Sequence, residues 1–149
     1  MRHARTSVII ASVIIFILAC SSGTKKTVIK PAHSLIGKWE GMDRTGKPGA
    51  FQFFENGSVF LIIDGKSLGG PDSSSIGQLK FTADYSKDPI ELDIIGIDPS
   101  GAERGKILMI VKFVSGDKIK IRTYFNDARP QNFDEETIDD TIHLDRKTE

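Results

Sequence analysis

Apolar and polar residues alternate along most of the chain after residue 34, with the period of two that is typical of half-buried β-strands. Leu79 and Phe81, for example, alternate with Lys80 and Thr82. No stretch in this part of the chain shows a helical period over ten or more residues. The pattern predicts eight strands, at Leu35–Met42, Ala50–Glu55, Val59–Ile63, Ile76–Asp84, Pro89–Ile97, Lys106–Val114, Lys118–Phe125 and Thr137–Arg146.

Short turn sequences separate the predicted strands. Asn56-Gly57 is a strong signal for a tight hairpin, and Asp64–Ser75, rich in Gly, Ser and Pro, is predicted to be the longest loop. Consecutive strands joined by short turns indicate an all-β domain with an up-and-down antiparallel sheet. Eight such strands, each with one apolar face, close into a small barrel that leaves no sheet edge exposed. A sandwich of two sheets is the alternative that the pattern leaves open.

The pattern before residue 34 is different. Met1–Ser7 carries two arginines and no acid, and the twelve residues Val8–Ala19 are apolar apart from Ser12 and end on a small residue. A basic start, a short apolar segment and a small residue at the end are typical of a secretory signal peptide. The apolar run is too short to cross about 30 Å of hydrocarbon, which needs about 20 apolar residues. Residues 1–19 are therefore predicted to be a cleaved signal peptide.

The end of this segment, Ile17-Leu18-Ala19-Cys20, resembles the bacterial lipobox, with Ile17 where Leu is commonest. The resemblance implies that Cys20 is lipidated, becomes the first mature residue and anchors the protein to a membrane. Ser21 rather than an aspartate follows it, which by resemblance to enterobacterial sorting favours the outer membrane. An ordinary signal peptide with a chance cysteine is the alternative. Cys20 is the only cysteine, so an internal disulfide is excluded.

Removal of the signal peptide leaves residues 20–149, which carry 18 basic and 20 acidic side chains, since Arg2 and Arg5 are lost from the 20 basic residues of the whole chain. A net charge of 18 − 20 = −2 gives no bulk attraction to nucleic acid or to an anionic membrane surface. Residues 20–34 are polar and aperiodic and are predicted to be a tether. Residues 35–149 have the length of one domain.

Gly37-Lys38-Trp39 in the first predicted strand, together with Arg146 at the end of the last, resembles the lipocalin-like (calycin) barrels. The resemblance implies that Trp39 closes one end of the barrel and that the Arg146 guanidinium stacks on its indole, an attraction of about 1–2 kcal/mol when desolvated. The alternative is that Trp39 is only a core aromatic residue and Arg146 a solvated charge.

Three further segments, in this order, resemble a poorly characterised family of small secreted bacterial domains that has no established activity. They are Asp88–Asp93, Gly116–Ile121 with its Gly-Asp start, and Arg129–Phe133 with its Arg-Pro-x-x-Phe pattern. The resemblance implies a fold and leaves the function open.

The sequence offers little chemistry for catalysis. His33 and His143 are the only histidines after the signal peptide, and no Cys, His or Asp spacing fits a metal site. Gly65–Gly70 lacks the Lys-Ser/Thr ending of a phosphate-binding loop. We therefore expect no catalytic residue, no metal and no cofactor.

Three residues are candidates for contacts with a ligand or a loop. Asp140 is in phase with the apolar residues of the last predicted strand, so it either faces the interior or marks a strand that begins after it, and we prefer the second interpretation. Arg129 and Phe133 flank Pro130, which fixes the backbone of a structured loop. Phe133 is expected to plug the barrel or to hold the loop in place, and Arg129 to contact the loop or a ligand.

These patterns predict an envelope lipoprotein with a non-enzymatic binding domain. Its occupant is either a small apolar ligand in the barrel or an envelope protein bound by the loops. The alternative is a structural or protein-interaction lipoprotein with a packed interior. The interior volume distinguishes them, because ligand sites measure about 300 Å³ or more.

Overall fold

A computed structural model describes residues 33–43, 45–69, 77–124, 126–137 and 139–148. The predicted signal peptide, Cys20 and most of the predicted tether lie outside the described residues. None of the described segments forms a helix long and apolar enough to span a membrane.

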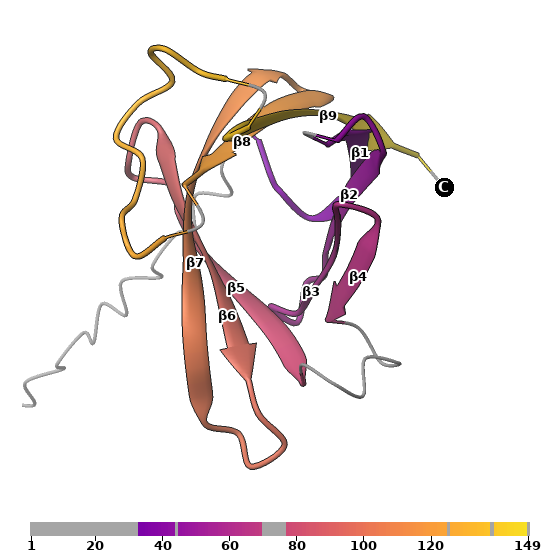
Figure 1. The fold of residues 1–149 in the computed structure, drawn as a ribbon. Coiled ribbons are helices and arrows are strands. Elements are labelled where there is room, and N and C mark those ends of the chain that lie inside the picture. Colours follow the sequence, from indigo (N-terminus) through magenta and orange to yellow (C-terminus); the bar gives the residue numbers. More distant parts are fainter. Residues whose placement is uncertain (1–32, 44, 70–76, 125, 138, 149) are drawn as a thin grey trace, which may run out of the picture. The chain divides into compact units, whose positions relative to one another are not determined.

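The regular structure in the described residues is β-strand (Figure 1). The strands form one antiparallel sheet in the order β4-β3-β2-β1-β9-β8-β7-β6-β5. The expectation of an all-β, up-and-down, barrel-like sheet is confirmed, because strands that follow each other in the chain are neighbours in the sheet everywhere except between β4 and β5. The strands are β1 (Gly37–Met42), β2 (Pro48–Phe53), β3 (Val59–Ile63), β4 (Lys66–Gly69), β5 (Gln78–Asp84), β6 (Ile90–Ile97), β7 (Glu103–Ser115), β8 (Lys118–Thr123) and β9 (Thr141–Lys147).

The prediction of eight strands is wrong, because the sheet has nine strands. The additional strand, β4, lies in the segment Asp64–Ser75 that we expected to be a loop. Asp64 and Gly65 have φ values of 53° and 71°, the left-handed conformation that a two-residue hairpin turn requires. This turn folds β4 back onto β3, where Ile63 pairs with Lys66.

Strand direction explains where the sheet stays open. Eight successive antiparallel pairings separate β4 from β5, so these two strands run in the same direction and cannot pair as antiparallel neighbours. The chain at the start of β3 does meet β5 in the antiparallel sense, through a bridge between Ser58 and Lys80. The Phe81 amide also donates to the Gly57 carbonyl over 2.9 Å. The barrel is therefore nearly closed, with β4 inserted at the seam.

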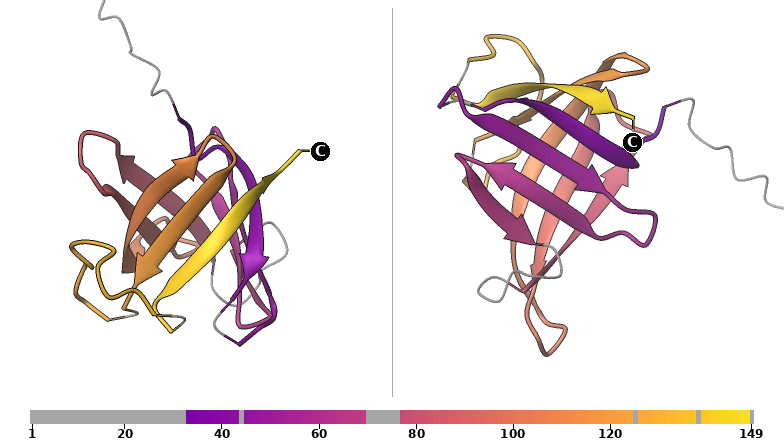
Figure 2. Two further views of the ribbon diagram at one scale, coloured as in Figure 1. Left: turned by 90° about the horizontal axis from the view of Figure 1, so that it is seen from above. Right: turned by 90° about the vertical axis from the view of Figure 1, so that its right-hand side faces the viewer.

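The first and last strands pair, as barrel closure demands. β1 and β9 lie side by side (Figure 2). Trp39 on β1 is the register partner of Arg146 on β9, and Lys38 is the partner of Lys147. β9 begins at Thr141, four residues later than the sequence pattern predicted, and β1 begins at Gly37 instead of Leu35. We call the end of the barrel where β1 starts and β9 ends the closed end. The opposite end, where β9 begins, is the mouth.

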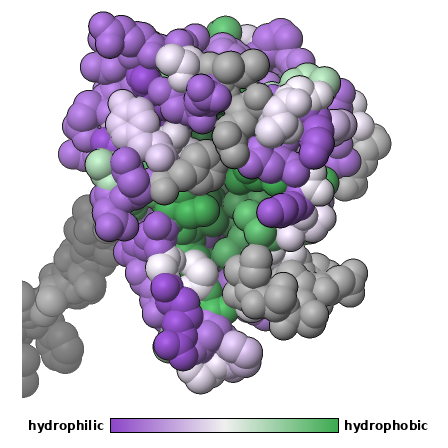
Figure 3. All heavy atoms as spheres, viewed as in Figure 1, coloured by the Kyte–Doolittle hydropathy of each residue, from purple (hydrophilic) through white to green (hydrophobic). Residues whose placement is uncertain are grey.

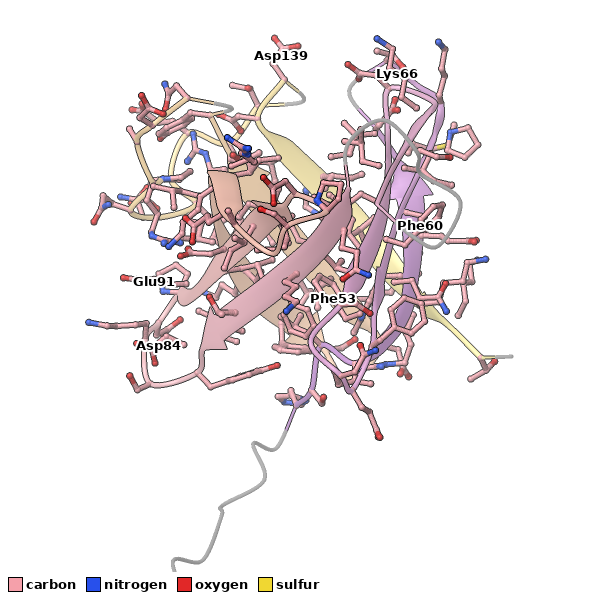
Figure 4. The ribbon with its side chains drawn as sticks, turned by 90° about the horizontal axis from the view of Figure 1, so that it is seen from below. Phe53, Phe60, Lys66, Asp84, Glu91 and Asp139 are labelled. Atoms are coloured by element: carbon pink, nitrogen blue, oxygen red, sulfur yellow. The ribbon has the colours of Figure 1, made fainter. Side chains whose placement is uncertain are left out.

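Apolar side chains from the inner face of nearly every strand fill the barrel. Phe53 points into the interior, whereas Phe60 on the adjacent strand lies on the outer side (Figure 4). The Phe53 ring packs 4.9 Å from that of Phe81 across the seam and 5.9 Å from that of Phe51. Each such burial contributes about 1.5–3 kcal/mol. The buried core consists of Leu35, Trp39, Phe51, Phe53, Val59, Leu61, Leu79, Leu92, Ile94, Met109, Val111, Ile119, Ile121 and Leu144.

Candidate functional site

The closed end is organised around Trp39, which is fully buried. Its indole N–H donates to the Leu35 carbonyl over 2.7 Å. The Arg146 guanidinium carbon lies 4.0 Å from the centre of the Trp39 ring. The same guanidinium donates to the carbonyls of Ile36 (2.8 Å) and Ser34 (2.7 Å), so it also fixes the segment that leads into β1. The pairing of the first strand with the last and the stacking of Arg146 on Trp39 therefore occur at the same end of the barrel.

Gly37 is required by the same arrangement. Its φ of +117° lies in a region that side-chain-bearing residues rarely adopt. A Cβ atom at this position would lie 3.1 Å from Nη1 of Arg146. The Gly-x-Trp spacing therefore brings both the Gly37 backbone and the Trp39 indole against the guanidinium of Arg146.

The segment 126–137 between β8 and β9 forms a strap that packs on the outside of the barrel. One attachment is Arg129, which donates to the carbonyls of Leu92 (3.2 Å) and Met109 (2.6 Å) and to the carboxylate of Asp93. Glu91 lies 3.7 Å from its Nε. Because these partners use both terminal nitrogens of the guanidinium, Arg129 is a loop contact in this structure.

Phe133 lies on the outer side of the barrel as part of the same strap. The ammonium group of Lys120 on β8 sits 4.5 Å from the centre of its ring. Lys120 also forms a 2.6 Å ion pair with Glu136 of the strap. Phe133 therefore holds the strap against β8, the second of the two roles that the sequence suggested.

The strap buries an arginine that sequence reasoning missed. Alternation places Arg122 on the outer face of β8, yet its side chain is only 6% exposed. It donates to the carbonyls of Asn132 (3.0 Å), Asp134 (2.7 Å) and Glu135 (3.1 Å), and to Oδ2 of Asp140 (2.9 Å). The alternation of residues within one strand does not show whether another segment of the chain packs on its outer face.

β9 begins at Thr141, directly after Asp140, in agreement with the interpretation that we preferred from the sequence. Its Oδ1 accepts hydrogen bonds from the Thr137 amide (3.1 Å) and the Thr141 hydroxyl (2.6 Å). Burial raises the pKa of Asp140, but the hydrogen bonds from Thr141, Thr137 and Arg122 lower it by more. Asp140 therefore remains an anion that joins the strap to the mouth.

The mouth contains the cavity in which a ligand would be sought. Its volume is about 40 Å³. On the face seen in Figure 3, apolar atoms form the floor of a hollow that hydrophilic side chains surround. Among the described residues that line the mouth, the charged ones are all acidic. The lining residues are Asp43, Phe51, Ile63, Met109, Ile121, Thr123, Asp139, Asp140, Thr141 and Ile142.

Asp43 is the most deeply buried charge of the mouth, with 4% of its surface exposed. Its Oδ1 accepts hydrogen bonds from the Thr45 amide (2.9 Å), the Thr45 hydroxyl (2.7 Å) and the Lys47 amide (3.0 Å). Its Oδ2 is buried. Burial raises the pKa of Asp43, but the hydrogen bonds that its carboxylate accepts from the Thr45 side chain and from the backbones of Lys47, Thr45 and Asp64 lower it by more.

Gly49 allows Asp43 to lie beside the apolar wall of the mouth. A Cβ atom on Gly49 would lie 3.3 Å from Cβ of Asp43 and 2.8 Å from Cδ1 of Ile142. The carboxylate and the aliphatic side chain are therefore both packed against the backbone of this one glycine.

The two histidines lie away from the mouth. The His33 ring stacks on Phe113 at 4.9 Å near the closed end, and His143 is exposed on β9, 3.5 Å from Glu136. Within the described part of the chain, no group of three or more His, Cys, Asp or Glu side chains is placed to hold a metal ion.

Comparison of the chain with protein-family models, with curated proteins and with solved structures found no match.

Proposed function

We propose that this protein is a lipid-anchored envelope lipoprotein whose lipocalin-like barrel binds another envelope protein and catalyses no reaction. The observation that carries the proposal is the filled interior. The mouth cavity of about 40 Å³ is well below the 300–1,000 Å³ of typical small-molecule sites. The packed aromatic and aliphatic core favours the protein-interaction alternative over a small apolar ligand.

Anchoring through Cys20 is supported by the lipobox pattern at the end of the apolar segment. A single cysteine that carries more than one acyl chain gives stable membrane attachment. We place the protein in the bacterial envelope outside the cytoplasm, on the outer membrane, because Ser21 follows the cysteine.

A lipocalin-like identity of the barrel is supported by the closed end. The arginine of the last strand lies over the tryptophan of the first, as the Gly-x-Trp resemblance implies. The ninth strand, β4, is an addition at the seam and leaves this closure untouched.

The end at which the chain enters the barrel supports a binding role for the mouth. The chain enters the barrel at the closed end, where Ser34 and Ile36 bind Arg146 and the Leu35 amide donates to the Tyr85 hydroxyl over 3.2 Å. Asp139 of the mouth and Asp84 of the closed end lie at opposite ends of the barrel (Figure 4). The mouth therefore lies at the end of the barrel opposite to the one at which the described chain enters it.

The test is site-specific photo-crosslinking of the full-length lipoprotein in its own cells. A photoreactive amino acid in place of Asp139, which is exposed at the mouth, is expected to give a discrete adduct with a second protein. The same amino acid in place of Glu55, exposed in the turn between β2 and β3 at the closed end, serves as the matched control. Equal adducts from both positions, or none from the mouth together with a co-purified apolar ligand in native mass spectrometry, would contradict the proposal.

A further inference from the structure

The closed end of the barrel exposes a large apolar side chain on each of the three hairpins that turn there. Phe54 directly follows β2, Tyr85 directly follows β5, and Val114 lies in β7 just before the turn to β8. Their exposed fractions are 37%, 37% and 60%. A single exposed apolar residue needs no explanation, but one on every hairpin at the same end indicates a surface that meets an apolar partner.

Two of these residues lie beside the segment through which the described chain enters the barrel. The Tyr85 hydroxyl accepts a hydrogen bond from the Leu35 amide over 3.2 Å. Val114 directly follows Phe113, whose ring stacks on that of His33 at 4.9 Å. The exposed apolar side chains are therefore next to the point from which the chain leads back to Cys20.

The connection between Cys20 and this end of the barrel is short. Twelve residues, 21–32, separate Cys20 from His33. An extended chain spans at most about 3.3–3.6 Å per residue, so these two residues are no more than roughly 45 Å apart. With Cys20 anchored in lipid, this length allows the closed end to touch the bilayer. The inference rests on this part of the proposed function.

The charges at the closed end give no preference for an anionic membrane, because both signs are present. The exposed acidic residues in the turns and strand ends there include Glu55, Asp84, Asp88 and Asp117, and the basic ones include Lys87, Lys118 and Lys147. We therefore expect burial of apolar side chains, and not lipid charge, to stabilise a contact with the bilayer.

We propose that the closed end is a membrane-contacting surface, with Phe54, Tyr85 and Val114 in the interfacial region of the bilayer that holds the anchor. Tyrosine suits this region, because its ring is apolar and its hydroxyl is polar. Apolar side chains at such a surface enter the boundary between headgroups and acyl chains by about 5–10 Å. The contact orients the barrel, so that the mouth faces away from the bilayer and toward a protein partner.

The experiment places a polarity-sensitive fluorophore on single introduced cysteines of the lipidated protein in phosphatidylcholine vesicles. The thiol of Cys20, the only native cysteine, carries the lipid, so the introduced cysteine alone reacts with the fluorophore. The variants are Phe54→Cys, Tyr85→Cys and Val114→Cys, and Met42→Cys, 62% exposed at the mouth, is the matched control. We expect nitroxide lipids to quench the three closed-end labels, more strongly when the nitroxide is near the headgroup than at the chain end. The label at position 42 should stay unquenched.

The outcomes separate the membrane contact from the anchor. Equal quenching of all four labels, or quenching of none while the protein floats with the vesicles, would overturn the proposal. Closed-end labels that are shielded from water but unquenched would overturn it too, because another part of the chain or a protein would then cover this end. Loss of flotation would reject lipid anchoring, and the inference with it. A protein adduct at Asp139 together with unquenched closed-end labels would reject only the membrane contact.

A second set of variants isolates the apolar side chains. A label at Glu55→Cys reports on the closed end without replacing an apolar residue, because Glu55 is exposed in the same turn as Phe54. We expect Phe54→Ser combined with Val114→Ser to lose most of the quenching of this label, whereas Met42→Ser, the matched control, should lose none. Thermal unfolding establishes that the double variant is folded. A folded double variant that is quenched as strongly as the parent, or quenching confined to vesicles that contain phosphatidylglycerol, would overturn the role of the apolar side chains.

Discussion

Arg146 lies over the ring of Trp39 at 4.0 Å, and the two residues are also backbone register partners on β9 and β1. One pair thus joins the two ends of the folded sequence twice, through the sheet and through the side chains. The guanidinium adds hydrogen bonds to Ser34 and Ile36, which lie before the first strand. The closed end is therefore the place where a local change should affect the whole barrel.

We expect Trp39→Ala to destabilise the domain by about 3–5 kcal/mol, because it removes a fully buried aromatic side chain. Arg146→Ala should destabilise it by less. The double variant should be less destabilised than the sum, with a coupling free energy of roughly 0.5–2 kcal/mol. Urea denaturation of the four proteins measures this cycle, and Lys147→Ala, on the exposed neighbouring residue, is the control. Strict additivity would show that the contact contributes nothing.

Gly37→Ala should destabilise the domain by about 1–3 kcal/mol, because a non-glycine residue is strained at φ +117°. The new methyl group would also push against Arg146. Gly105→Ala is the matched control, since it lies in β7 with ordinary φ and with no atom within 4 Å of an added Cβ. Thermal unfolding of both variants compares them, and a control as unstable as Gly37→Ala would refute the special role of Gly37.

Arg129→Lys should loosen the part of the strap around residue 129 without unfolding the barrel, while Arg122 still binds the carbonyls of Asn132, Asp134 and Glu135. A lysine cannot reach the carbonyls of Leu92 and Met109 and the carboxylate of Asp93 at once, since it lacks the planar fork. We expect faster amide exchange in the strap, with little change in β1 and β9. Arg104→Lys is the control, because the Arg104 side chain, which pairs with Asp98, is 73% exposed. Unchanged exchange in the Arg129 variant would mean that other contacts hold the strap.

The hydrogen-bonded Asp98 in its turn predicts that the domain loses stability in acid. Hydrogen bonds, led by that of the Ser100 hydroxyl, hold the pKa of Asp98 below its usual value. A group with a lowered folded-state pKa stabilises the fold above its unfolded pKa, about 3.9 for aspartate, and loses this contribution as the pH falls through the folded pKa. Ser100→Ala should therefore destabilise the protein at pH 7 more than at low pH. Urea denaturation at the two pH values tests this, and equal differences would contradict it.

Cys20→Ala should abolish the incorporation of labelled fatty acid. The prediction follows from the lipobox pattern Ile17–Cys20 and from the absence of any other cysteine in the sequence. Metabolic palmitate labelling followed by immunoprecipitation measures it, with Ser21→Ala as the control that keeps the cysteine. Undiminished labelling of the cysteine variant would reject lipidation at this position.

The alternation of apolar residues predicted the core well, because burial of one face of a strand is written directly into the sequence. Leu79 on β5 and Leu92 and Ile94 on β6 are buried as expected. β4 was missed because its short Gly- and Ser-containing segment lacks alternation. The Asp64-Gly65 dipeptide was the available signal for that hairpin.

The sites that depend on contacts between distant segments could not be predicted in the same way. Arg122 continues the alternation of Lys118 and Lys120 on the outer face of β8, and it is buried by contacts with the strap and with Asp140. The turn at Asp43, in contrast, has a local signal in the sequence. An Asp or Asn followed two residues later by Ser or Thr is a local signal for a side chain that binds its own turn. That pattern recurs at Asp43, Asn56, Asp84 and Asp98, each of which accepts hydrogen bonds in its turn.

The seam between β4 and β5 has a consequence for how the domain comes apart. A ring of nine strands is an odd-numbered ring, and antiparallel pairing can complete only an even one. Antiparallel pairing alone therefore cannot complete the ring, and β4 and β5 are the two edge strands of the sheet. Edge backbone groups open and exchange with solvent at a lower free energy than those of interior strands. The first strand and the last strand, at opposite ends of the sequence, are interior strands of this sheet, while its two free margins come from the middle of the chain.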